Sequence, residues 1–377
     1  MDDQTAIAPR TNPELFGHED AEKVLADAFH GGALAHAWLL SGPQGIGKAT
    51  LAFRFARYVL KHSGNGEIED PIGGTPDAGS LFGDDLAMDA PEDDPEPVDA
   101  AHQPGILSVD ETDPVFRRVA SGGHADLAVV ERAIKNEKTG DRFTVIRVDD
   151  VRAIGGFLRM TPAEGGWRVV IVDAADDMNL NAQNALLKIL EEPPARSLIL
   201  MVAHVPGRLL PTIRSRCRNL ALRALPDDTV AGLIRSRVPD VPDDEARTFA
   251  ELACGSIGRA LRLIEGGGGA LFNEINNIFD NLPKLNVPLV HDFAGRLARK
   301  SAERSYDVAL DLIERRIRER IRAISLNPDG ARSLEPWLEV WDNSLRLRDR
   351  AESVNLDRKQ VILGILHAAA EAADGRI

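Results

Sequence analysis

The segment GPQGIGKA at residues 42–49 constrains the fold more than any other feature of this chain. The apolar run before it, 36–41, predicts a buried strand, and the amphipathic run after it, 48–61, predicts a helix. The spacing G-x-x-x-x-G-K between a strand and a helix is typical of a phosphate-binding loop, whose glycines let backbone N–H groups turn toward phosphate oxygens. The candidate nucleotide-binding residues in this loop are Gly42, Gly45, Gly47 and Lys48.

Two positions needed for nucleotide hydrolysis carry only a methyl group. A Ser or Thr that binds Mg²⁺ normally follows the lysine, but Ala49 stands there and Thr50 comes one residue later. One helical step rotates a side chain by about 100°, so we expect Thr50, a further candidate, to face elsewhere. Asp173 ends the apolar run 167–176 and could hold a metal through water, but Ala174 follows where hydrolysing proteins of this class place a glutamate. Since losing a positioned base costs about 10²–10⁴ in rate, we expect weak hydrolysis or none.

The remaining pattern predicts an α/β domain followed by helices. Strand-like runs at 126–133, 142–148, 167–176 and 197–204 alternate with helical runs at 148–160 and 179–192, which indicates a parallel sheet covered on both faces. Asp176 and Asp177, beyond the third strand, are interpreted as helix caps. In the second helix we expect four leucines to pack on the sheet: Leu180, Leu186, Leu187 and Leu190.

Beyond residue 224 the sequence predicts only helices. We expect short helices over 227–265, a flexible glycine joint at 266–269 and roughly five helical segments over 270–375. The predicted domains are therefore 1–223, 224–266 and 267–377.

An acidic insertion sets the net charge of −14. Residues 62–116 hold 15 of the 59 acids and no Lys or Arg, which leaves 44 acids against 45 bases elsewhere. The stretch 63–115 is rich in Gly and Pro and poor in apolar runs, so we expect it to be mostly disordered. It is either a solvated loop without a specific role or a competitor for a basic partner surface.

Composition indicates a cytoplasmic protein. There is no 18-residue apolar run and no secretory signal in the first ten residues, MDDQTAIAPR. The two cysteines, Cys217 and Cys254, are expected to be free and mostly buried.

Three segments together resemble the delta-prime family of bacterial DNA polymerase III clamp-loader subunits, which are AAA+ proteins: HAWLLSGPQGIGKATLA, VVIVDAADDMNLNAQNALLKILEEPP and LLPTIRSRC. The similarity covers residues 13–60 and 124–265, and the C-terminal part matches only in class. It implies an AAA+ parallel-sheet P-loop domain, then a small helical lid domain, then a C-terminal helical bundle of the collar type.

The resemblance implies a rigid stator within a five-subunit ring that places a sliding clamp on primed DNA. The implied partners are the ATPase and delta subunits of the loader, with the clamp and DNA reached through the assembly, and no membrane. Own ATPase and polymerase activity are expected to be absent. An ATP-hydrolysing AAA+ motor subunit is the alternative, and a small-molecule P-loop enzyme a third class.

Three residues acquire roles only through this resemblance. Arg216, in the SRC motif, would be an arginine finger that acts on a neighbouring subunit's ATP, although pairing with an acid of its own chain is the alternative. Arg259, in GSIGRA, would face the nucleotide from the lid. His204 would occupy the strand-end sensor position, where a capped, hydrogen-bonded histidine is an equal alternative.

The chain departs from its relatives in one respect. Many carry a four-cysteine zinc module after the loop helix, whereas residues 62–125 contain no cysteine, so we expect neither zinc nor another bound metal. The sequence leaves open whether ATP or ADP binds.

Overall fold

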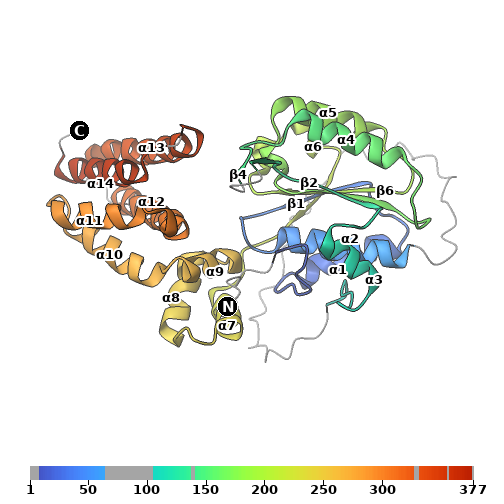
Figure 1. Ribbon diagram of the computed structural model, residues 1–377, viewed down its shortest axis with the longest axis horizontal. Coiled ribbons are helices and arrows are strands. Elements are labelled where there is room, and N and C mark those ends of the chain that lie inside the picture. Colours follow the sequence, from blue (N-terminus) through green and yellow to red (C-terminus); the bar gives the residue numbers. More distant parts are fainter. Residues whose placement is uncertain (1–7, 64–104, 137–140, 327–330, 355, 376–377) are drawn as a thin grey trace. The chain divides into compact units, whose positions relative to one another are not determined.

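The computed structural model describes residues 8–63, 105–136, 141–326, 331–354 and 356–375. Contacts between Cα atoms group the chain into two compact units, 7–223 and 224–377 (Figure 1). The further division of the second unit at residue 266 stays a prediction.

The first unit is built on a five-stranded parallel sheet with the strand order β2-β5-β6-β1-β7. The strands are β1 (Ala37–Ser41), β2 (Leu127–Val130), β5 (Arg168–Val172), β6 (Ser197–Ala203) and β7 (Arg218–Ala221). Every residue of β1, β5 and β6 is buried, as expected for parallel strands covered on both faces. The predicted α/β fold class is confirmed.

Helices cover both faces of this sheet (Figure 1). One face packs against α1 (Glu19–His30), α2 (Lys48–His62) and α3 (Pro114–Ser121), and the other against α4 (Val148–Arg159) and α5 (Leu180–Glu191). Successive strand residues serve opposite cores: Trp38 and Leu40 face the α1–α3 side, while Ala37 and Leu39 face the α4–α5 side.

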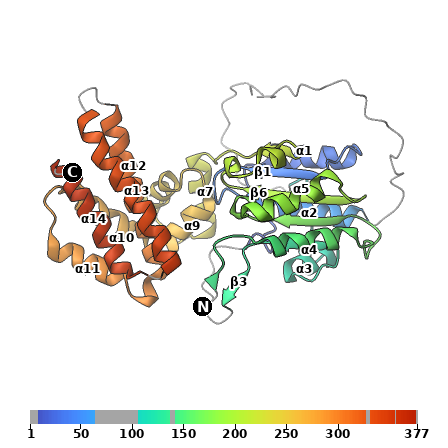
Figure 2. The same ribbon diagram turned by 90° about the horizontal axis from the view of Figure 1, so that it is seen from above.

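Short elements complete this unit. They are η1 (Ala175–Asp177), η2 (Pro206–Arg208), α6 (Pro211–Arg214) and a small antiparallel pair, β3 (Ile134–Asn136) with β4 (Asp141–Arg142). Figure 2 shows β3 set apart from the main sheet. The strand predicted over 142–148 is wrong, because only its first residue belongs to β4 and Ile146 makes a single bridge to Met178.

The predicted disordered insertion, 63–115, is wrong at its C-terminal end. Residues 64–104 lie outside the described part of the chain, but Leu107 and Val109 are buried, and Asp113 caps α3 by accepting a hydrogen bond from the backbone N–H of Val115 at 2.8 Å. Leu107 and Val115 belong to the α1–α3 core, a long-range contact that the low apolar content of the stretch concealed.

The prediction for the four leucines of α5 holds for three of them. Leu186 and Leu190 are buried and Leu187 packs partly on the core, but Leu180 is 61% exposed. Leu180 is the first residue of α5, next to the cap formed by Asn179, so it lies at the end of the helix. The predicted packing of Leu180 is therefore wrong.

The second unit is helical in its described residues, as predicted. It contains three short helices, α7 (Asp227–Arg237), α8 (Asp243–Ala253) and α9 (Ile257–Glu265). Five more follow: α10 (Gly268–Asp280), α11 (Val287–Leu297), α12 (Glu303–Ser325), α13 (Ala331–Val354) and α14 (Arg358–Asp374), with the short turn η3 (Lys300–Ala302) between α11 and α12. None of the helices in the described part of the chain has the length and apolar content needed to cross a bilayer.

The predicted flexible glycine joint is instead a tightly packed corner between α9 and α10. A Cβ on Gly266 would lie 2.6 Å from Cγ2 of Val308, and one on Gly268 would lie 2.6 Å from the carbonyl oxygen of Leu263. Gly266 and Gly268 are therefore needed for close approach of the chain, and Gly267 between them has a φ of +71°, so the prediction of a flexible joint is wrong.

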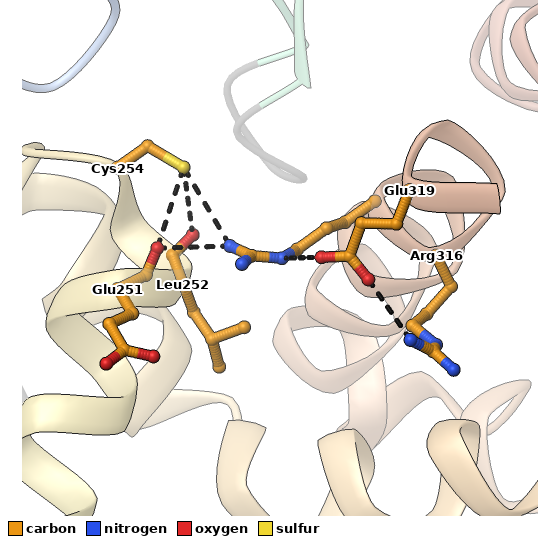
Figure 3. Close-up of polar contacts among 6 residues, drawn as sticks. Glu251, Leu252, Cys254, Arg316 and Glu319 are labelled. Carbon is orange, nitrogen blue, oxygen red and sulfur yellow. Dashed lines mark hydrogen bonds and ion pairs between the residues drawn. The ribbon is translucent and has the colours of Figure 1, made fainter. Parts of the chain in front are cut away.

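Arg315 ties the C-terminal end of α8 to α12; Figure 3 shows its partners Glu251 and Glu319 together with Cys254. Its Nη1 donates to the carbonyl oxygen of Glu251 at 3.1 Å, and its Nε donates to Oε1 of Glu319 at 2.7 Å. A cation at a helix C-terminus is favourable because the last carbonyls carry partial negative charge. Cys254 lies beside this contact and is exposed, so the prediction that both thiols are mostly buried is wrong for Cys254.

Candidate functional site

The phosphate-binding loop connects β1 to α2 and depends on glycine. Gly42 has a φ of +144° and Gly47 a φ of +109°, values that side chains disfavour. A Cβ on Gly42 would also lie only 2.4 Å from the carbonyl oxygen of Leu222. Gly47 precedes α2 and offers no side-chain cap, so the first N–H groups of the helix are available to an anion.

Lys48 is buried within this loop, with 2% of its surface exposed. Its Nζ donates to the carbonyl oxygen of Gly42 at 2.7 Å and to that of Pro43. Burial lowers the pKa of Lys48 to about 8, and the carboxylates of Asp176 and Asp173 oppose that shift. The ammonium group of Lys48 is therefore hydrogen-bonded to carbonyl oxygens of the loop. Phosphate oxygens bound in the loop would compete with these carbonyls for the same ammonium group.

Strand register brings the other candidates to the same edge of the sheet. Ser41 of β1 pairs with Ala203 of β6, so His204 comes next to the start of the loop. Val172 of β5 pairs with Met201, so Asp173 follows at this edge too. The structure thus brings together Lys48 and Asp173, which are 125 positions apart in the sequence. A role for Asp173 in binding stays a prediction.

The positions after the lysine carry no exposed hydroxyl. Ala49 packs partly against the α1–α3 core. Thr50 lies in the first turn of α2 and is 7% exposed. Its place in nucleotide binding stays a prediction.

The turn after β5 differs from the sequence interpretation. Asn179 caps α5 by accepting from the backbone N–H of Ala182, so the interpretation of Asp176 and Asp177 as its caps is wrong. The buried carboxylate of Asp176 instead accepts from the backbone N–H groups of His204, at 3.0 Å, and Val205, at 2.8 Å. This contact could not be read from local sequence because it spans 28 residues.

Ala174 adopts a left-handed conformation, with φ +58° and ψ +58°. Its methyl group cannot activate water. Asp177 pairs with Arg132, whose nearest nitrogen is 3.4 Å away. Burial raises the pKa of Asp177. In the described turn, the carboxylate of Asp176 is thus hydrogen-bonded to backbone N–H groups and that of Asp177 is paired with an arginine. Neither carboxylate is therefore free to act as a general base.

His204 is half-buried at the end of β6. Its Nδ1 is buried without a hydrogen-bond partner in the described part of the chain. The pKa of His204 is lowered by burial first and by Lys48 second, while Asp176 acts in the opposite direction. The alternative of a hydrogen-bonded histidine therefore holds for its backbone N–H but not for Nδ1.

Sequence reasoning missed His18, which lies against the loop. Its Nε2 donates to the carbonyl oxygen of Ile46 at 2.7 Å, and burial lowers its pKa, which favours the neutral ring. Leu15 also contacts the loop, since a Cβ on Gly47 would lie 2.9 Å from its Cδ1. The only local signal was the place of His18 directly before the acidic first turn of α1.

Arg216 follows α6 and is exposed. Its Nη2 lies 2.9 Å from Oε1 of Glu191, and its Nη1 donates to the carbonyl oxygen of Thr212 at 3.0 Å. The same-chain pairing weighed as an alternative is therefore present, and the finger stays a prediction. Cys217 packs partly on the α4–α5 core, where burial raises the pKa of its thiol to about 12, as expected for a packing residue.

Arg259 belongs to the second unit, in the first turn of α9. Ser256 caps this helix by accepting from the backbone N–H of Arg259 at 3.1 Å, and Nε of Arg259 is buried without a hydrogen-bond partner in the described residues. Its predicted role at the nucleotide stays a prediction. Among the residues that the structure describes, no cluster of three or more His, Cys, Asp or Glu side chains could hold a metal ion.

Comparison with known proteins gives a consistent picture. The family described as "DNA polymerase III, delta subunit" matches residues 101–226. DNA polymerase III subunit delta' of Pseudomonas aeruginosa is 32% identical over 251 residues, which cover 67% of this chain and 61% of that protein. DNA polymerase III subunit gamma/tau of Mycobacterium tuberculosis is 29% identical over 226 residues, which cover 60% of this chain and 31% of that protein.

Among solved structures, the Holliday junction branch migration motor RuvB of Thermotoga maritima is similar with a TM-score of 0.41 and 16% identity, over 96% of this chain and 90% of that one. The similarity to these sequence relatives agrees with the resemblance indicated by the phosphate-binding loop, the LLKILEEPP helix and the RSRC segment. The chain is therefore similar to the DNA polymerase III subunits delta' and gamma/tau over 67% and 60% of its own length, and it spans less than two thirds of the length of either relative.

Proposed function

We propose that this chain is a delta'-type subunit of the clamp loader of the DNA polymerase III holoenzyme, and that it does not hydrolyse nucleotide itself. It would act in the cytoplasm as a rigid stator that helps to load a sliding clamp on primed DNA. Its partners would be the ATPase and delta subunits of the loader, and the clamp and DNA would be reached through the assembly.

One observation carries this proposal: the phosphate-binding loop keeps its glycines and Lys48, but the groups for metal anchoring and water activation are lacking. Ala49 provides no hydroxyl, and Ala174 stands in a left-handed turn where a glutamate would be needed. The neighbouring carboxylate of Asp176 is already bound to two backbone N–H groups. ATP or ADP could occupy such a loop without being turned over.

Arg216 is the proposed contribution to catalysis by a neighbouring subunit. Its pair with Glu191 has 36% and 49% of the two side chains exposed, and exposed pairs contribute only about 0–1 kcal/mol. The guanidinium can therefore leave Glu191 at small cost and reach the γ-phosphate of a nucleotide bound by the next subunit. There it would stabilise charge in the transition state.

Reconstitution of the loader tests this proposal. Arg216→Ala should join the complex normally and remove most turnover at the adjacent ATP site, since an arginine finger contributes about 10³–10⁵ in rate. Arg214→Ala is the matched control, because Arg214 is also exposed and ends the same short helix. Normal ATPase activity of a loader assembled with Arg216→Ala would refute the arginine-finger role of Arg216. Failure of the wild-type chain to assemble with the other subunits would refute the proposed function.

The alternative is an ATP-hydrolysing AAA+ motor subunit, which the intact glycines, Lys48 and Asp173 favour. Phosphate release by the purified chain alone discriminates between the two. A steady-state rate near one per second, ordinary for an enzyme, would establish the motor, whereas the proposed stator releases essentially none.

A further inference from the structure

His204 is, after Lys48, a second nitrogen-bearing side chain beside the phosphate-binding loop, and the proposed function does not use it. The pairing of Ser41 with Ala203 puts His204 next to Gly42, where the loop begins. Its backbone is fixed by the bond from its N–H to Asp176, while Nδ1 is buried and lacks a partner in the described residues. A buried ring nitrogen without a partner costs free energy in the empty protein, so an acceptor that enters the loop would relieve that cost.

The charge balance around the loop indicates what could enter. Lys48 and the uncapped N-terminus of α2 attract anions, and the loop retains the glycines that a phosphate chain needs. In ordinary sites of this kind a magnesium ion, held by the hydroxyl after the lysine, neutralises part of the charge on the phosphates. Here Ala49 cannot hold that ion, so a bound polyphosphate needs another cation.

The groups that face His204 come from three elements. Lys48 belongs to α2, Asp176 and Asp177 belong to η1, and Arg132 follows β2. Asp176 is bound to the backbone and Asp177 is paired with Arg132. Lys48 is therefore the neighbouring charge that a ligand can redirect, because its present acceptors are only loop carbonyls.

We propose that the loop binds the polyphosphate of a nucleotide without a divalent cation, and that the imidazole of His204 takes up a proton on binding and donates a hydrogen bond to the phosphates. The ammonium of Lys48 would turn from the carbonyls of Gly42 and Pro43 to the same phosphate chain. The protonated imidazole of His204 would thus supply the positive charge that a bound metal ion supplies in ordinary sites of this kind. This inference deepens the proposed function at its nucleotide site but does not depend on assembly.

The sign of the pH dependence follows from linkage. In the empty protein His204 is mostly neutral at pH 7.5, because burial and Lys48 both disfavour its charged form. A bound anion favours the charged form, so binding takes up a proton and affinity falls as the pH rises. Between the pKa values of His204 in the free and bound protein, His204 contributes a fall that approaches tenfold per pH unit. Lys48, whose pKa is about 8 in the empty protein, adds to the fall at higher pH because a bound anion favours its charged form too.

Titration calorimetry of the full chain in EDTA tests the inference, with ADP, ATP and inorganic pyrophosphate as separate ligands, at pH 6.5, 7.5 and 8.5. Buffers with different enthalpies of ionisation report the number of protons taken up. We expect binding without metal, net uptake that approaches one proton and affinity that is higher at pH 6.5 than at 8.5. Pyrophosphate that binds as tightly as ADP would assign recognition to the phosphates alone, and weaker binding would assign part of it to the nucleoside.

His204→Gln is the decisive variant, since glutamine can still donate a hydrogen bond but cannot titrate. It should bind with less dependence on pH and take up fewer protons than wild type, the difference being the contribution of one imidazole, because the changes at Lys48 and at the ligand's own phosphate are common to both proteins. His291→Gln is the matched control, an exposed histidine in the second unit. Circular dichroism verifies that both variants are folded.

Three results would overturn the inference: no binding in EDTA, binding only when Mg²⁺ is added, or equal proton uptake by wild type and His204→Gln. A chain that binds polyphosphate in EDTA but never joins a loader would leave this inference standing and remove the proposed function. The two failures are therefore distinguishable.

Discussion

The buried ion pair between Glu22 and Arg54 gives a sharp prediction about the helices that carry the loop. Glu22 lies on α1 and Arg54 on α2, their Oε1 and Nε atoms are 2.6 Å apart, and each side chain is 4% exposed. The guanidinium also donates to the carbonyl oxygen of Pro13. Glu22→Ala therefore leaves a buried charge with a single carbonyl partner, and loss of one member of such a pair costs about 3–5 kcal/mol.

Hydrogen exchange measured by mass spectrometry on the full chain can localise this loss. Since each 1.4 kcal/mol is a factor of ten, amides of α1 and α2 that exchange through opening of this unit should exchange roughly 10²- to 4 × 10³-fold faster in Glu22→Ala. Helices α10–α14 belong to the other unit, so their exchange rates provide an internal reference that should not change.

The double variant Glu22→Leu with Arg54→Met distinguishes loss of a partner from loss of the pair. Because buried pairs can often be replaced by apolar side chains without loss, we expect protection to return to within about 1–2 kcal/mol of wild type. An increase of less than tenfold in the single variant, or a double variant as unstable as the single one, would refute the reasoning.

Two further predictions concern titration and thiol chemistry. The pKa values of His18, His124 and His204 are all lowered, chiefly by burial, so the folded protein binds fewer protons than the unfolded chain and the free energy of unfolding of the first unit should fall as the pH drops below about 6.5. Urea unfolding at pH 7.5 and 5.5, above the range of most carboxylates, checks this, and an increase in stability on acidification would contradict it. Native protein should also react with one equivalent of a thiol reagent, at the exposed Cys254. Cys217 should react only after unfolding, because burial raises the pKa of its thiol to about 12. Two thiols that react equally fast in the native protein would be inconsistent with this structure.

The sequence by itself determined the parallel sheet, the phosphate-binding loop and the two missing hydrolytic groups. These features are local: three glycines with positive φ between a strand and a helix, Ala49 after Lys48, and Ala174 after Asp173. Such patterns fix backbone conformation and side-chain chemistry over a few residues, so they can be read without knowing what lies across the sheet.

Only the tertiary structure decided which side chains serve the site. The bond from Asp176 to the end of β6, the contact of His18 with Ile46 and the place of His204 beside Gly42 each join residues at least 28 positions apart. The packed corner at Gly266 is a contact of the same kind. Helical and strand periodicity carries no information on such pairings, because they depend on which elements become neighbours when the strands take the order β2-β5-β6-β1-β7.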